Sequence, residues 1–98
     1  MIRNFLAYDL AVELHSECET IAARPHLKDQ LERASLSIVL NLAEGSAKPT
    51  PKEQRRFYAI AFGSLRETQA LLDILKHETA KTRAHRLGGL LYRLVHRR

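Results

Sequence analysis

Between positions 30 and 45 the chain reads QLERASLSIVLNLAEG, with apolar residues on almost every side of a helix from Ala34 onward. A helix that is apolar nearly all round is expected to be buried. Five polar residues at steps of three and four share one quarter of its circumference, and we name them the polar seam: Gln30, Arg33, Ser37, Asn41 and Glu44. Since buried polar groups need partners, the seam predicts a neighbouring helix that supplies them.

Turn and capping signals divide the chain into four predicted helices, at about residues 5–23, 26–44, 51–77 and 80–97. Pro25 separates the first two, and Gly45 ends the second as a left-handed residue. Thr50, Pro51 and Glu53 form a capping box before the third helix. A break near Thr79, a possible cap, separates the last two. Short connections between four helices predict an all-α, antiparallel up-and-down four-helix bundle, with residues 1–98 as one domain.

In an antiparallel pair, facing residues have position numbers with a constant sum. This rule predicts two buried ion pairs between the second and third helices, Arg33 with Glu67 and Arg56 with Glu44. It also sets small residues opposite the uncharged part of the seam, with Gly63 facing Ser37 and Ala59 facing Asn41. Removing one partner of a buried pair is expected to cost about 3–5 kcal/mol.

The net charge of +5 is unevenly distributed. Residues 1–32 hold three basic and six acidic side chains, whereas residues 76–98 hold seven basic side chains and one acidic one. The two ends could attract each other in the fold, or the basic end could bind a polyanion. The candidate phosphate-binding residues are Lys81, Arg83, Arg86, Arg93, Arg97 and Arg98, with a second cluster of Lys48, Lys52 and Arg55. Such cations can follow a phosphate backbone but do not read bases. The alternative is that a basic last turn complements the helix dipole.

The sequence offers little for catalysis or metal binding. Its one cysteine, Cys18, excludes an intramolecular disulfide, and His15 with Cys18 would supply too few ligands for a closed metal site. A glycine-rich phosphate loop is missing from the sequence. We therefore expect no enzymatic activity, metal or cofactor. Charges at Asp9 and Glu13 interrupt the N-terminal stretch, and the longest uncharged run is too short to cross a bilayer, so we expect a cytoplasmic protein.

The stretch QLERASLSIVLNLAEGSAKPTPKEQRRFYAIAFGSLRET resembles a family of four-helix-bundle proteins encoded within intervening sequences of bacterial large-subunit ribosomal RNA genes. The matching positions in the second helix are Gln30, Arg33, Ala34, Ser37, Ile38, Asn41, Glu44 and Gly45. In the third helix they are Arg56, Phe57, Ala61, Gly63, Ser64 and Glu67. The resemblance implies a bundle assembled as a ring, commonly a pentamer, without established enzymatic activity. A similar fold is that of the accessory protein of diversity-generating retroelements, a basic pentameric barrel that associates with reverse transcriptase and nucleic acid.

Together these observations predict a non-enzymatic homo-oligomeric bundle, with a pentamer favoured, that binds RNA or DNA without sequence specificity. It would act as a scaffold or as an accessory to a nucleic-acid-processing protein. The alternative is a structural protein–protein interaction module with no nucleic-acid role.

Overall fold

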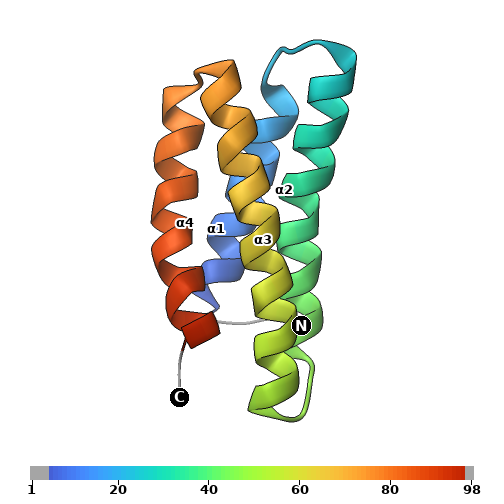
Figure 1. Cartoon of the computed structure of the whole chain (residues 1–98), viewed down its shortest axis with the longest axis vertical. Helices are drawn as coiled ribbons and strands as arrows, with labels where there is room; N and C mark the ends of the chain where they lie inside the picture. Colours follow the sequence, from blue (N-terminus) through green and yellow to red (C-terminus); the bar gives the residue numbers. More distant parts are fainter. Residues whose placement is uncertain (1–4, 97–98) are drawn as a thin grey trace.

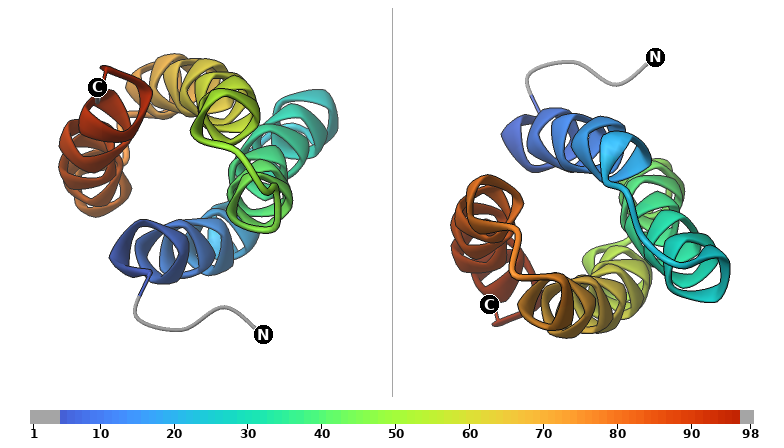
Figure 2. Two further views of the ribbon diagram at one scale, coloured as in Figure 1. Left: turned by 90° about the horizontal axis from the view of Figure 1, so that it is seen from below. Right: turned by 90° about the horizontal axis from the view of Figure 1, so that it is seen from above.

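The computed structural model describes residues 5–96 as four helices: α1 (Leu6–Thr20), α2 (Pro25–Ser46), α3 (Pro51–Leu75) and α4 (Glu78–His96). Within this range there are no strands. Figure 1 shows the chain running up α1, down α2, up α3 and down α4. Seen end-on in Figure 2, the helices surround a common centre, and each lies beside its neighbour in the sequence. The prediction of an all-α four-helix bundle is confirmed.

The bundle encloses a core to which every helix contributes. The largest fully buried apolar side chains are Leu14, Leu31, Ile38, Leu42, Leu65, Leu72, Leu87 and Leu91. Within α2, α3 and α4 they recur at steps of four and seven residues, which bring successive side chains to one face of each helix. None of the helices in the described part of the chain is long and apolar enough to cross a membrane.

The start of α3 is as predicted. The Thr50 side-chain oxygen accepts a hydrogen bond from the Glu53 backbone N–H at 3.2 Å, and the Thr50 hydroxyl donates to the Glu53 carboxylate at 2.9 Å. Pro51 occupies the first helical position, where its missing N–H would have had no partner. The helix ends at Leu75, and the next residue, Lys76, adopts the left-handed conformation with φ 56°.

The predicted role of Gly45 as a left-handed helix terminator is wrong. Gly45 lies inside α2, which continues to Ser46, and its φ is not positive. Its function is close packing instead. A Cβ at this position would lie 2.7 Å from Tyr58 Cε1 and 3.0 Å from Phe57 Cβ, so α3 approaches α2 where there is no side chain.

The start of α4 also differs from the prediction. The helix begins at Glu78, and the Ala80 N–H donates to Nδ1 of His77 at 3.3 Å. The Thr79 hydroxyl, predicted to cap this helix, donates to the Glu17 carboxylate of α1 at 2.6 Å. The His77 side chain therefore caps the helix in place of Thr79, and the Thr79 hydroxyl instead joins α4 to α1.

The prediction that the polar seam is buried is wrong. Gln30, Arg33 and Glu44 are exposed, and only Ser37 and Asn41 are half-buried. Apolar residues on nearly every side of α2 do not mean that every side is buried. Leu36 and Leu40 point outward in the single chain and are 40% and 57% exposed.

The half-buried part of the seam is nevertheless satisfied by α3. The Ser37 and Ser64 hydroxyls lie 2.8 Å apart, and the Asn41 amide donates to the Ser37 carbonyl and hydroxyl at 2.9 and 3.1 Å. The predicted partner of Ser37 was Gly63, so the observed contact is one residue further along. A hydroxyl pair thus replaces the predicted small-residue contact.

One of the two predicted ion pairs is present. Arg33 and Glu67 approach to 4.0 Å, but their side chains are 73% and 47% exposed, so the pair contributes about 0–1 kcal/mol rather than the value of a buried pair. Within residues 5–96, Glu44 pairs with Lys48 at 3.0 Å and not with Arg56. Lys48 lies four residues after Glu44, just beyond the end of α2, and its ammonium group folds back to the carboxylate.

Candidate nucleic-acid interface

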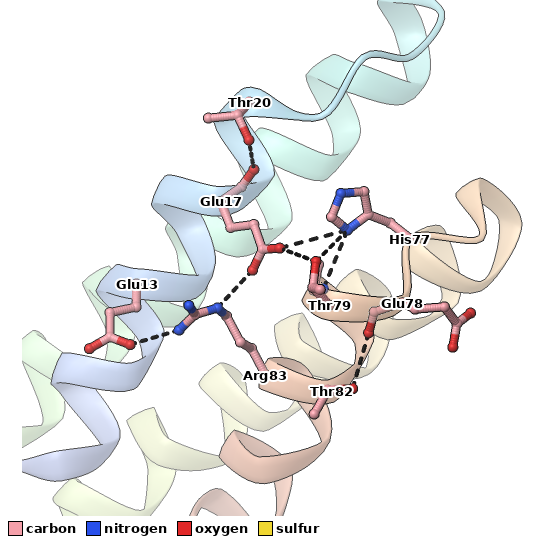
Figure 3. Close-up of polar contacts among 9 residues, drawn as sticks. Glu13, Glu17, Thr20, His77, Glu78, Thr79, Thr82 and Arg83 are labelled. Atoms are coloured by element: carbon pink, nitrogen blue, oxygen red, sulfur yellow. Dashed lines mark hydrogen bonds and ion pairs between the residues drawn. The ribbon is translucent and has the colours of Figure 1, made fainter.

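Arg83, one of the candidate phosphate-binding residues, is held by α1. Its guanidinium lies 2.8 Å from the carboxylates of both Glu13 and Glu17 (Figure 3). Glu17 also accepts the Thr79 hydroxyl and lies 3.7 Å from Nδ1 of His77. These contacts join the first helix to the last. The alternative in which the acidic N-terminal part of the chain attracts the basic C-terminal part therefore holds for Arg83. Its guanidinium already has carboxylate partners within the fold.

Two further candidates are also paired with carboxylates. Lys81 lies 3.2 Å from Asp73 and 3.5 Å from Glu78, and these contacts raise the pKa of its ammonium group. Lys48 is paired with Glu44 and lies 5.1 Å from the centre of the Phe57 ring. Both lysines are exposed enough to exchange a surface carboxylate for a phosphate, because such pairs are weak.

The remaining described candidates make no ion pair with any described residue. Arg86 and Arg93 are exposed on α4, Lys52 is exposed at the start of α3, and Arg55 is half-buried one turn further on. The candidates Arg97 and Arg98 lie outside the described residues.

Two exposed cations of α3 that lack a carboxylate partner among residues 5–96 were not selected from the sequence as phosphate-binding candidates: Arg56 and Arg66. Arg66 on α3 is exposed, has no carboxylate partner among residues 5–96, and lies 5.9 Å from the centre of the Phe62 ring. Arg66 follows Ala59 by seven residues and Arg55 by eleven. These spacings indicate from the sequence that Arg66 and Arg55 lie on the same side of α3. The cations that remain unpaired are therefore concentrated on α3 and α4.

Cys18 is a buried thiol rather than a reactive site. It is fully buried, and desolvation raises its pKa to about 11, with hydrogen bonding to Ser35 acting in the opposite direction. The neighbouring His15 places Nδ1 2.8 Å from the Ser35 hydroxyl. In the part of the chain that the structure describes, no three His, Cys, Asp or Glu side chains are grouped as a metal site would need.

The fold and its surface charges define a small basic four-helix-bundle protein. The family described as 23S rRNA-intervening sequence protein matches residues 5–86, and the chain belongs to this family. The match extends beyond α3 into the first half of α4. A comparison with curated proteins found no match.

Proposed function

We propose that this chain is a non-enzymatic, oligomeric scaffold or accessory protein that binds RNA or DNA without sequence specificity. The observation that carries the proposal is the uneven use of charge in ion pairs. On α3 and α4, Lys52, Arg55, Arg66, Arg86 and Arg93 lack a carboxylate partner among the described residues. Of the acidic residues on these two helices, Asp73, Glu67 and Glu78 are already paired.

A surface whose lysines and arginines lack carboxylate partners attracts the phosphate backbone of a nucleic acid, because each phosphate that such a side chain neutralises releases counterions. Within residues 5–96, Arg83 is the one arginine of α4 that pairs with carboxylates of α1, so Arg86 and Arg93 remain available. Arginine side chains on a helix surface contact backbone oxygens and carry little sequence information, so binding without specificity is expected.

The test is the binding of fluorescently labelled RNA and DNA at several salt concentrations, measured by anisotropy. The logarithm of the affinity should fall linearly with the logarithm of the salt concentration. Replacing Arg86 and Arg93 by Gln should weaken binding and reduce the slope by about 0.7–0.9 for each phosphate that the variant no longer neutralises. The matched control is Arg24→Gln, which removes an exposed cation before α2. Absence of binding at low salt, or equal effects of Arg24→Gln and the α4 substitutions, would reject the proposal.

A second part of the proposal is self-association, with a ring-like pentamer favoured by the family resemblance. The supporting observation is that large apolar side chains of α2 and α3, among them Leu36, Leu40 and Ile60, are exposed in the single chain. Leu40 and Ile60 lie at a similar level along the α2–α3 pair, because both fall between the Ser37–Ser64 contact and the close approach of Gly45 to Tyr58. Exposed apolar side chains that gather on one face of a protein are typical of a protein interface.

Light scattering on the purified chain tests this part. A mass that is a multiple of the 11.2 kDa chain should be found, and Leu40→Glu should reduce it. Val12→Glu, at an exposed apolar position on α1, is the control and should leave the mass unchanged. A monomeric wild-type chain would overturn the ring. Association without nucleic-acid binding would favour the alternative, a protein–protein interaction module.

A further inference from the structure

A polar pocket and an aromatic cluster lie one after the other along the line where α3 and α4 pack together, and we name this strip of surface the α3–α4 groove. Its α3 side carries Phe62, Arg66 and Asp73 at steps of four and seven, and its α4 side carries Lys81 and Tyr92 at a step of eleven. These spacings keep each set on one flank of its helix. Two contacts across the groove fix the pairing: Lys81 with Asp73 at 3.2 Å, and the rings of Tyr92 and Phe62 with centres 6.3 Å apart. From Phe62 to Asp73 the helix rises about 16 Å.

One half of this groove is an open polar pocket. Its volume is about 430 Å³, within the range of roughly 300–1,000 Å³ that small ligands occupy, and it is lined by Arg66, Gln69, Ala70, Asp73, Lys81 and His85. Lys81 neutralises the one carboxylate, Asp73. The Arg66 guanidinium and the Gln69 amide then remain as donors, a combination that suits a phosphate group.

Gly88, one of the paired glycines of α4, has no side chain that would fill the space beside Gln69. A Cβ at Gly88 would make ordinary contacts, 3.5 Å from Leu65 Cδ2 and 3.7 Å from Gln69 Nε2, and a Cβ at Gly89 would meet nothing within 4 Å. Packing therefore does not require either glycine. At Gly88 the missing side chain leaves the space beside Gln69 open.

The other half of the groove is aromatic. The Tyr92 ring is stacked on His96 with centres 4.0 Å apart, and Phe62 meets Tyr92 edge-on at 74°. The His96 Nδ1–H donates to the Tyr92 carbonyl at 2.9 Å, which holds the imidazole in place. Although it takes part in this cluster, Tyr92 remains 55% exposed. Arg66 joins the two halves, since its guanidinium lies 5.9 Å from the Phe62 ring centre.

We propose that the α3–α4 groove binds single-stranded nucleic acid, with one or more bases continuing the Phe62–Tyr92–His96 cluster and the adjoining phosphate beside Arg66. This inference rests on the proposed function. It adds that the nucleic acid is single-stranded and that it binds in the α3–α4 groove. Cations alone would bind a duplex and a single strand alike, because both carry phosphates. Aromatic rings distinguish them: the base faces of a duplex are already stacked on one another, whereas a single strand leaves them free.

The experiment compares the binding of the full chain to a U-rich RNA, a T-rich DNA of the same length, and a duplex with the same number of phosphates, at one salt concentration. Tyr92→Leu removes the ring but keeps an apolar side chain, and it should weaken binding to both single strands about 5- to 100-fold while changing duplex binding less than about twofold. Arg86→Gln, which removes an exposed cation outside the groove, is the matched control and should weaken all three ligands by similar factors. Circular dichroism verifies that the variants are folded.

If Tyr92→Leu fails to fold, His96→Ala, at an exposed position, should give the same selective loss. Equal affinity for single strands and duplex, with no selective effect of Tyr92→Leu or His96→Ala, would overturn the groove while leaving the proposed function intact. Failure of all three ligands to bind would overturn both. A preference for RNA over DNA single strands would support the groove and add recognition of the 2′-hydroxyl.

Discussion

Gly45 and Gly89 offer the sharpest test of how α2 and α3 pack. Both glycines lie inside helices, but a Cβ at Gly45 would lie 2.7 Å from the buried Tyr58 ring and 3.0 Å from Phe57 Cβ, whereas a Cβ at Gly89 would meet nothing within 4 Å. The same substitution, Gly→Ala, should therefore change stability in opposite directions at the two positions.

The expected magnitudes follow from two opposing effects. Alanine in a helix interior is favoured over glycine by up to about 1 kcal/mol, which is the whole effect expected for Gly89→Ala. At Gly45 the added methyl group also overpacks the interface, which costs about 1–3 kcal/mol. Both Tyr58 and Phe57 must move, so overpacking outweighs the helix preference, and we expect Gly45→Ala to lower the free energy of unfolding by up to about 2 kcal/mol.

Thermal and urea unfolding at one fixed protein concentration measure both variants, because association would make the midpoint depend on concentration. In a chain of this size, each kcal/mol shifts Tm by about 4–8 °C. Gly45→Ala should lower Tm and Gly89→Ala should raise it. If Gly45→Ala is as stabilising as Gly89→Ala, the close approach of α2 to α3 at this point is refuted.

Three further predictions concern single side chains. Thr50→Ala removes the cap of α3 and should lower the free energy of unfolding by about 0.5–2 kcal/mol in urea titrations; an unchanged midpoint would contradict the cap. Arg83→Met removes the contact between α4 and the carboxylates of Glu13 and Glu17, and it should cost about 1–2 kcal/mol, mostly by leaving half-buried Glu17 without its cation; high salt should reduce the difference from wild type. Because burial raises the pKa of Cys18 to about 11 from 9.0, the folded protein should react with a thiol reagent at pH 8 at least about 100-fold more slowly than the urea-unfolded chain. The same shift favours the protonated thiol in the fold, so its contribution to stability is present below pH 9 and is lost as pH rises toward 11; fast labelling of folded protein would contradict the burial.

The sequence was sufficient for the fold class and the core because both follow from local periodicity. Leu14, Leu65 and Leu91 repeat at helical spacing with their neighbours and are all fully buried. The capping box at Thr50 was equally readable, since it involves residues only three apart. Each of these features depends on a few adjacent turns of one helix.

Features that depend on a second helix were harder to predict. The burial of the polar seam was predicted wrongly because it was inferred from apolar residues on nearly every side of the helix. One of these residues, Leu40, faces outward. The glycine at position 45 has the same sequence signature as a helix terminator, but it serves a contact with Tyr58, thirteen residues away. For the candidate site, the cations were visible in the sequence, but the pairing of Arg83 with α1 and the availability of Arg66 depend on how the helices are arranged.

Photo-cross-linking would show directly whether nucleic acid lies along the α3–α4 groove. The full chain would be irradiated with a single-stranded RNA containing 4-thiouridine, digested, and analysed by mass spectrometry for peptides that carry a nucleotide. We expect adducts on the segments around Phe62 and Tyr92, and we expect Tyr92→Leu to abolish them while duplex binding persists. Adducts confined to α1 and α2 would contradict binding in the groove.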